Sequence, residues 1–122
     1  MIPVYIGSTI IIVWDVGHIV AARSVIAGFG ELTLDNRRIL TMEWMVEGLT
    51  LCFLGVLAAL VAITGGLASP YGRITIYAIA SMLFILAGLS AVTGAKTPIG
   101  PMKACPIVKT LVAALYVAGV GL

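Results

Sequence analysis

The strongest constraint on the fold is a series of four long apolar stretches separated by short, turn-rich connections. Apolar residues make up 61% of the chain and charged residues 10%, and the mean hydropathy is +1.20. Soluble domains are about 25% charged. A helix needs roughly 20 mainly apolar residues to cross the ~30 Å hydrocarbon core of a bilayer, so this chain has room for about four spans. The sequence therefore predicts an all-α, polytopic membrane protein that folds as a single four-helix transmembrane bundle.

Glycine and proline mark the connections between the four predicted spans. Gly65 and Gly66 end the second span as a C-cap and turn, and the run Gly94–Pro101 ends the third. Pro106 suits the first turn of the fourth helix. We expect one domain, residues 1–122, without a separate soluble domain. The predicted spans cover approximately residues 3–22, 38–64, 73–93 and 106–122.

Basic residues predict the orientation of the bundle. Only Arg73 belongs to the second connection, whereas the first and third connections hold five basic residues: Arg23, Arg37, Arg38, Lys96 and Lys103. The positive-inside rule then places the first and third connections in the cytoplasm and both termini outside the cell membrane. The first segment has no Lys or Arg before Arg23 and stays apolar for too long to be a signal peptide, so we expect it to be retained.

Four ionisable side chains lie inside the first two predicted spans: Asp15, His18, Glu43 and Glu47. A charge at the bilayer centre costs at least ~2.5–3.5 kcal/mol, so such residues normally face a bundle interior or a water-filled cavity. If the two helices are antiparallel and share a cytoplasmic boundary, Asp15 lies level with Glu47 and His18 with Glu43. The spacings i, i+3 and i, i+4 put each pair on one helix face, and the two faces are expected to meet.

Three further residues complete this predicted polar layer. Lys109 is expected about one turn into the fourth helix, near the depth of Glu43, where pairing would offset the burial of both charges. Trp14 and Trp44 flank the layer, and either indole N–H could bind a carboxylate or a ligand. The candidate residues for ligand binding or proton relay are Trp14, Asp15, His18, Glu43, Trp44, Glu47 and Lys109.

Four chemistries are compatible with this layer. Bundle metal sites use inward Glu and His, but the Glu-x-x-His motif on two helices is missing, so no metal site is predicted. A histidine that changes charge near neutral pH could relay protons in a carrier, which with only four helices would act as a dimer. The same groups could perform acid–base catalysis on a lipophilic substrate. They could also form a structural network, since buried polar groups are paired whatever their purpose; the site would then be sought near Tyr77 and Tyr116.

The second span carries a family resemblance. Its run Glu43–Leu57, EWMVEGLTLCFLGVL, is similar to the second helix of the DoxX-like membrane proteins, in which an acidic residue precedes a Gly- and Leu-rich run. The resemblance implies a four-helix bundle associated with quinone-linked oxidoreductases, membrane redox complexes or assembly factors. The small multidrug resistance transporters have a similar length and helix count, but their membrane glutamate lies in the first helix, where this chain has Asp15.

The expected function is a buried polar pocket that binds a small lipophilic or amphiphilic molecule, in an accessory or redox-complex subunit. A proton-coupled carrier and a membrane enzyme remain the alternatives, and the cofactor is left open. Expected partners are membrane lipid, a lipophilic small molecule or quinone, and a second copy or a larger membrane complex. The net charge of +2 has no long basic run, which argues against nucleic acid. Cys52 and Cys105 form no Cys-x-x-Cys pair, which argues against thiol redox chemistry.

Overall fold

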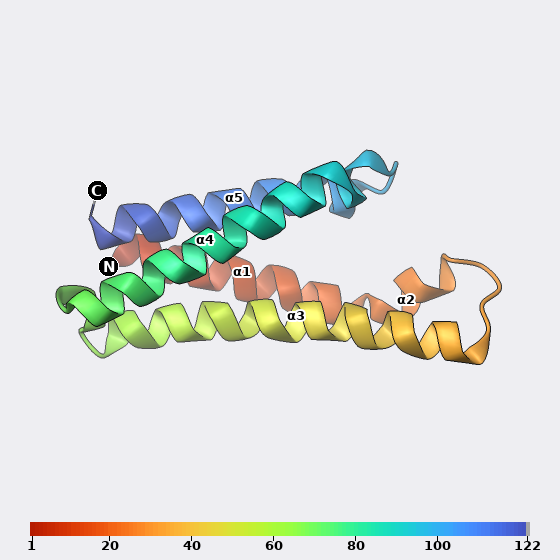
Figure 1. Ribbon diagram of the computed structural model, residues 1–122, viewed down its shortest axis with the longest axis horizontal. Coiled ribbons are helices and arrows are strands. Elements are labelled where there is room, and N and C mark those ends of the chain that lie inside the picture. Colours follow the sequence, from red (N-terminus) through yellow and green to blue (C-terminus); the bar gives the residue numbers. More distant parts are fainter. Residues whose placement is uncertain (122) are drawn as a thin grey trace.

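Four long helices form an all-α bundle in the computed structural model, which describes residues 1–121 (Figure 1). All four are long and apolar enough to cross a membrane, so the predicted fold class is confirmed. A short helix and two 3₁₀ turns lie in the connections. The elements are α1 (Ile2–Val20), α2 (Ala22–Ala27), α3 (Leu34–Ile63), η1 (Gly66–Ala68), α4 (Pro70–Val92), η2 (Gly94–Lys96) and α5 (Gly100–Val120).

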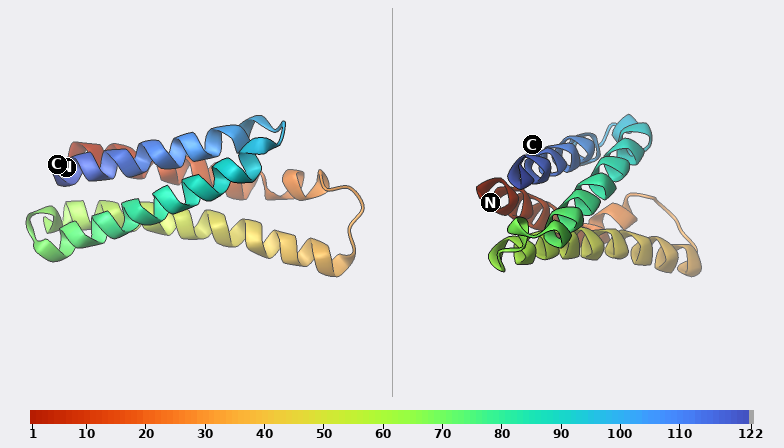
Figure 2. Two further views of the ribbon diagram at one scale, coloured as in Figure 1. Left: turned by 45° about the horizontal axis from the view of Figure 1, so that its top comes forward. Right: turned by 60° about the vertical axis from the view of Figure 1, so that its left-hand side comes forward.

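The bundle consists of two close helix pairs. Helix α1 packs along α3, α4 packs along α5, and α1 also packs on α5. Helix α4 starts beside the end of α3 and then diverges from it in both Figure 1 and Figure 2. The two termini lie together at one end, and α2 and η2 lie at the other (Figures 1 and 2). The divergence separates the pair α1/α3 from α4 at the α2 end.

Helix ends are set by local side-chain caps and by glycine. The Thr33 hydroxyl accepts a hydrogen bond from the Asn36 amide at 3.1 Å and caps α3. Gly65 ends that helix with φ 76°, a backbone conformation that glycine adopts at no steric cost. Ser69 caps α4 by accepting from the Gly72 amide at 3.0 Å. These signals explain why α3 and α4 reverse direction within a few residues.

The observed helix boundaries differ from the predicted spans at two places that matter for the site. Helix α5 begins at Gly100, because Pro101 occupies its first turn, and Pro106 lies inside the helix instead of at its start. The connection between the first two predicted spans contains a short helix, α2, which was not predicted. The predicted end of the fourth span, Leu122, lies outside the described residues.

Close approach of α1 and α3 depends on two glycines. A Cβ at Gly55 would come within 2.7 Å of Ile11 Cγ2, and a Cβ at Gly48 would overlap the Ile19 side chain. Small residues allow helix backbones to approach in this way where lipid provides no hydrophobic driving force between helices. The α1–α3 contact brings the polar residues of the first two spans onto one shared interface.

The core contains few polar side chains. Tyr116 is fully buried, and its hydroxyl oxygen lies 3.0 Å from the Ser8 hydroxyl, which joins α5 to α1. The buried polar and charged residues of the described chain are Ser8, Asp15 and Lys109. Two of these three come from the predicted polar layer.

Candidate functional site

Glu47 lies at the centre of a charged group that joins four helices. Lys109 Nζ on α5 donates to Glu47 Oε1 on α3 at 3.0 Å and to Ser90 Oγ on α4 at 3.0 Å. His18 Nε2 on α1 lies 3.5 Å from the second carboxylate oxygen, Oε2. We call Glu47, His18, Ser90 and Lys109 the Glu47 cluster.

Burial is unequal across the Glu47–Lys109 ion pair. The Lys109 side chain is 1% exposed, whereas the Glu47 side chain is 39% exposed. Removing one partner of a buried ion pair leaves an uncompensated charge and costs about 3–5 kcal/mol. Lys109 therefore depends on Glu47 for its charge partner, while the Glu47 side chain stays more than one-third exposed.

His18 is held by Trp44 as well as by Glu47. The Trp44 indole N–H donates to the His18 carbonyl oxygen at 2.6 Å, and His18 Nε2 lies 3.1 Å from the Trp44 carbonyl oxygen. The two rings stack, with centroids 3.8 Å apart and planes within 6°. Both neighbours of Nε2 are acceptors, a carbonyl and a carboxylate, so Nε2 carries a hydrogen and donates.

Asp15 lies beside this cluster without joining it. The residue is 1% exposed, and its Oδ2 atom has no hydrogen-bond partner among residues 1–121. A Cβ added to Gly48, the neighbour of Glu47, would lie 3.3 Å from the Asp15 carbonyl oxygen, so Asp15 sits at the expected depth. An unsatisfied buried polar group costs about 1–3 kcal/mol. Among the described residues, Asp15 is thus the one with a buried side-chain oxygen that lacks a hydrogen-bond partner.

The expected pairing of Lys109 with Glu43 is wrong. Lys109 binds Glu47, whereas Glu43 is exposed and makes no ion pair within the described chain. The cause is the early start of α5 at Gly100, which places Lys109 about 2.5 turns into the helix instead of one. The lysine consequently lies about one and a half turns deeper in its helix than predicted, where it meets Glu47.

A large groove opens beside the Glu47 cluster where α4 diverges from α3. Its volume is about 1100 Å³, and all five α-helices contribute to its wall. Most lining side chains are apolar, including Phe29, Leu86 and Met102, and the cluster supplies polar groups at its floor. Ligand sites in proteins have this composition, a mainly apolar concave wall with a few convergent polar groups.

Six of the seven candidate residues line this groove: Trp14, His18, Glu43, Trp44, Glu47 and Lys109. Asp15 is buried behind the wall. Tyr116 is bonded to Ser8 in the core, and neither it nor Tyr77 lines the groove.

Ser90 and the aliphatic half of the groove wall were not predicted from the sequence. Ser90 gives Lys109 its second acceptor, but serine in a membrane helix commonly bonds its own backbone, so its sequence position carries no signal. Met102 lies in α5, before the predicted start of the fourth span at Pro106. Within residues 1–121, no three His, Cys, Asp or Glu side chains converge as metal ligands.

These features define an integral membrane protein built as a four-helix bundle. A charged cluster lies between its four long helices. No protein-family model, curated protein or solved structure matches this chain. Membership of the DoxX-like family consequently stays a prediction.

Proposed function

We propose that the groove binds one lipophilic or amphiphilic molecule, with its apolar body against the α1, α4 and α5 walls and its polar head at Glu47. One observation carries the proposal. A carboxylate that neutralises a fully buried lysine keeps more than a third of its own side-chain surface exposed, and it lines a mainly apolar groove of about 1100 Å³. A network that served only to fix helix register would be expected to enclose both charges.

The polar groups of the groove favour a neutral head that donates hydrogen bonds. Glu43 and Glu47 present two carboxylates, and the single lysine is already engaged by Glu47 and Ser90. An anionic head would lie close to these two carboxylates, and like charges repel. A hydroxyl group, as in a quinol or another long-chain alcohol, could donate to Glu47 while an aromatic ring packs on Trp14 or Trp44.

Both tryptophans of the chain line the groove, so tryptophan fluorescence reports on its occupancy. We expect a bromine-labelled long-chain alcohol to quench the fluorescence of the detergent-solubilised protein saturably. The unbrominated alcohol should displace it and restore the signal. Quenching that rises linearly without saturation would instead indicate partitioning into the micelle and would contradict the proposal.

Two glycines provide a matched pair of variants for this titration. Gly17 lines the groove and Gly88 does not, and a Cβ at either position meets nothing within 4 Å. Gly17→Leu should obstruct the groove and abolish saturable quenching, whereas Gly88→Leu should bind as the parent does. Both variants should fold, because replacing a helical glycine by another residue favours the helix by roughly 0.5–1 kcal/mol. Equal binding by the two variants would place the ligand elsewhere.

The unpartnered Asp15 oxygen favours a second candidate, a proton-coupled carrier that acts as a dimer. Asp15 lies one turn from His18 on α1, and His18 lies beside Glu47 at the groove, so these groups form a series from the groove to the buried carboxyl. Asp15→Asn should then abolish proton uptake into proteoliposomes that contain the protein, while groove binding persists. Unchanged uptake would exclude this role.

We also propose that the α2 end of the bundle faces the cytoplasm, as the basic residues predict. With Cys52 and Cys105 replaced by alanine, Ala68→Cys should react with an impermeant thiol reagent in intact cells, and Ser24→Cys should not. Both positions are exposed in the structure. The opposite labelling would reverse the orientation.

A further inference from the structure

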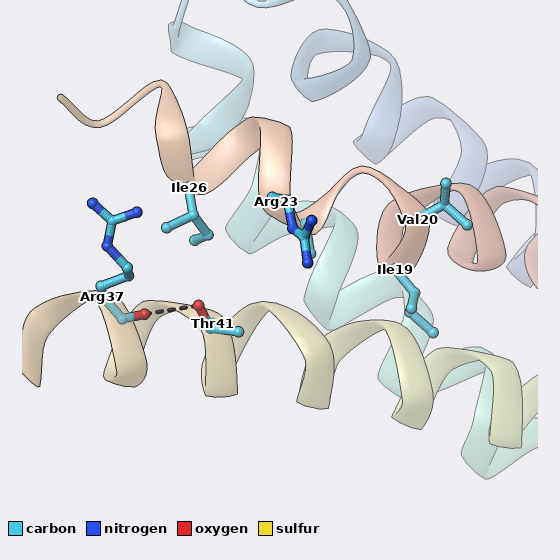
Figure 3. Close-up of a pocket in the computed structure, with 7 residues that line it drawn as sticks. Ile19, Val20, Arg23, Ile26, Arg37 and Thr41 are labelled. Carbon is cyan, nitrogen blue, oxygen red and sulfur yellow. Dashed lines mark hydrogen bonds between the residues drawn. The ribbon is translucent and has the colours of Figure 1, made fainter. Parts of the chain in front are cut away.

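A second cleft, of about 730 Å³, lies between α2 and α3 next to the junction of α1 and α2 (Figure 3). Arg23 extends from the α2 side toward α3, and Arg37 extends from α3 toward α2. The remaining wall includes Ile19, Val20 and Ile26. The cleft thus combines two guanidinium groups from different helices with an apolar floor.

Neither arginine has an anionic partner in the described structure. The ion pairs among residues 1–121 involve Glu47 with His18 and with Lys109, and none reaches Arg23 or Arg37. The hydroxyl proton of Thr41, at the edge of the cleft, is donated to the Arg37 carbonyl oxygen at 2.8 Å. The free donors of the cleft are therefore guanidinium N–H groups, which match phosphate geometry through paired hydrogen bonds.

The position of the cleft selects a lipid over a free anion. Ile19 and Val20 are the last residues of a helix long enough to span the membrane, and Val20 is 78% exposed, so the floor of the cleft continues the apolar surface of α1. Basic pockets between helices at the membrane boundary bind lipid head groups. A free phosphate would use the guanidinium groups and leave the apolar floor in water.

We propose that this cleft binds an anionic phospholipid, with the phosphate between Arg23 and Arg37 and an acyl chain against Ile19, Val20 and Ile26. The lipid is distinct from the amphiphile of the large groove, because the cleft selects a negative head and the groove a neutral one. The two sites share only Ile26 in their walls. Binding at the cleft does not depend on the function of the Glu47 cluster.

Native mass spectrometry of the detergent-extracted protein tests the proposal with defined lipids. Phosphatidylglycerol and phosphatidylcholine of identical acyl chains are added separately, and the bound fraction is measured for each. Phosphatidylglycerol should bind the parent protein more tightly, and inorganic phosphate at millimolar concentration should not displace it. Equal binding of the two lipids would overturn the proposal, and displacement by inorganic phosphate would overturn the assignment to a lipid.

Charge variants locate the lipid. Arg23→Gln and Arg37→Gln should each weaken phosphatidylglycerol binding about fivefold, and the double variant about thirtyfold. Arg38 is the matched control, because it is exposed beside Arg37 and does not line the cleft. Arg38→Gln should bind as the parent does. If Arg38→Gln weakens binding as much as Arg37→Gln, the attraction is a general surface charge and the cleft is not the site.

A steric variant separates the cleft from the charge it carries. Thr41 is exposed at the edge of the cleft, so Thr41→Trp should fill the space while both arginines remain. We expect this variant to lose phosphatidylglycerol and to keep the thermal stability of the parent. Gly17→Leu, which obstructs the large groove, should retain phosphatidylglycerol. Loss of the lipid from Gly17→Leu with retention by Thr41→Trp would overturn the assignment.

Discussion

Glu47→Gln should be far more destabilising than Lys109→Met, although each removes one half of the same ion pair. Glu47→Gln leaves Lys109 charged, 1% exposed and 3.0 Å from a neutral amide, with Ser90 as its other acceptor. The expected loss is about 3–5 kcal/mol of unfolding free energy, the cost of breaking a buried pair from one side.

Lys109→Met leaves the partly exposed Glu47 carboxylate without its lysine partner. Glu47 is 39% exposed at the groove, where water can solvate it, and His18 lies 3.5 Å away. The expected cost is about 1 kcal/mol, the net value of one hydrogen bond. The double variant should come within about 1 kcal/mol of the parent, since a buried ion pair replaced by groups of similar volume is often neutral or stabilising.

Unfolding of the detergent-solubilised protein, followed by far-ultraviolet circular dichroism, provides these free energies. The cycle should give a coupling free energy of at least ~3 kcal/mol between Glu47 and Lys109. Glu31→Gln is the control, because Glu31 is exposed in the first connection and its change should stay within about 0.5 kcal/mol. If Glu47→Gln costs no more than Lys109→Met, the argument from unequal burial is wrong.

Three further variants test the packing around the site by the same unfolding measurement. Tyr116→Phe should cost about 1–3 kcal/mol, because it leaves the Ser8 hydroxyl buried without its partner; no change would mean that Ser8 finds another acceptor. Gly55→Leu should cost more unfolding free energy than Gly88→Leu, because only a leucine at position 55 would collide with the α1 isoleucines. Equal stability of the two variants would argue against the close α1–α3 contact. Trp44→Phe removes the hydrogen bond to the His18 carbonyl and should cost about 1 kcal/mol. Unchanged stability would show that ring stacking alone holds the histidine.

Hydropathy predicts the four helices because the bilayer requires long apolar segments whatever packing follows. The antiparallel register also predicts that Asp15 and His18 face the polar residues of the second span. His18 in fact contacts Trp44, which follows the expected Glu43 in the chain, and Glu47, which lies one turn farther along α3. Once the boundary of a helix is known, the depth of each residue follows from the helical rise, which is the same in every sequence.

The partners of Lys109 could not be predicted in this way. Its depth follows from where α5 begins, and the Gly- and Pro-rich connection before it reads as irregular although Pro101 starts the helix. A shift of about one turn changes the carboxylate that the lysine meets. The groove could not be predicted from the sequence either, because it depends on the angle at which α4 diverges from α3.

The central claim, that the groove holds a bound amphiphile, is tested most directly by native mass spectrometry of the protein as extracted from its membrane. We compare the parent with Gly17→Leu and Gly88→Leu, which differ in whether the added side chain enters the groove. We expect a co-purified small molecule of one defined mass on the parent and on Gly88→Leu, and its loss from Gly17→Leu. The same bound mass at the same occupancy on all three proteins would contradict it.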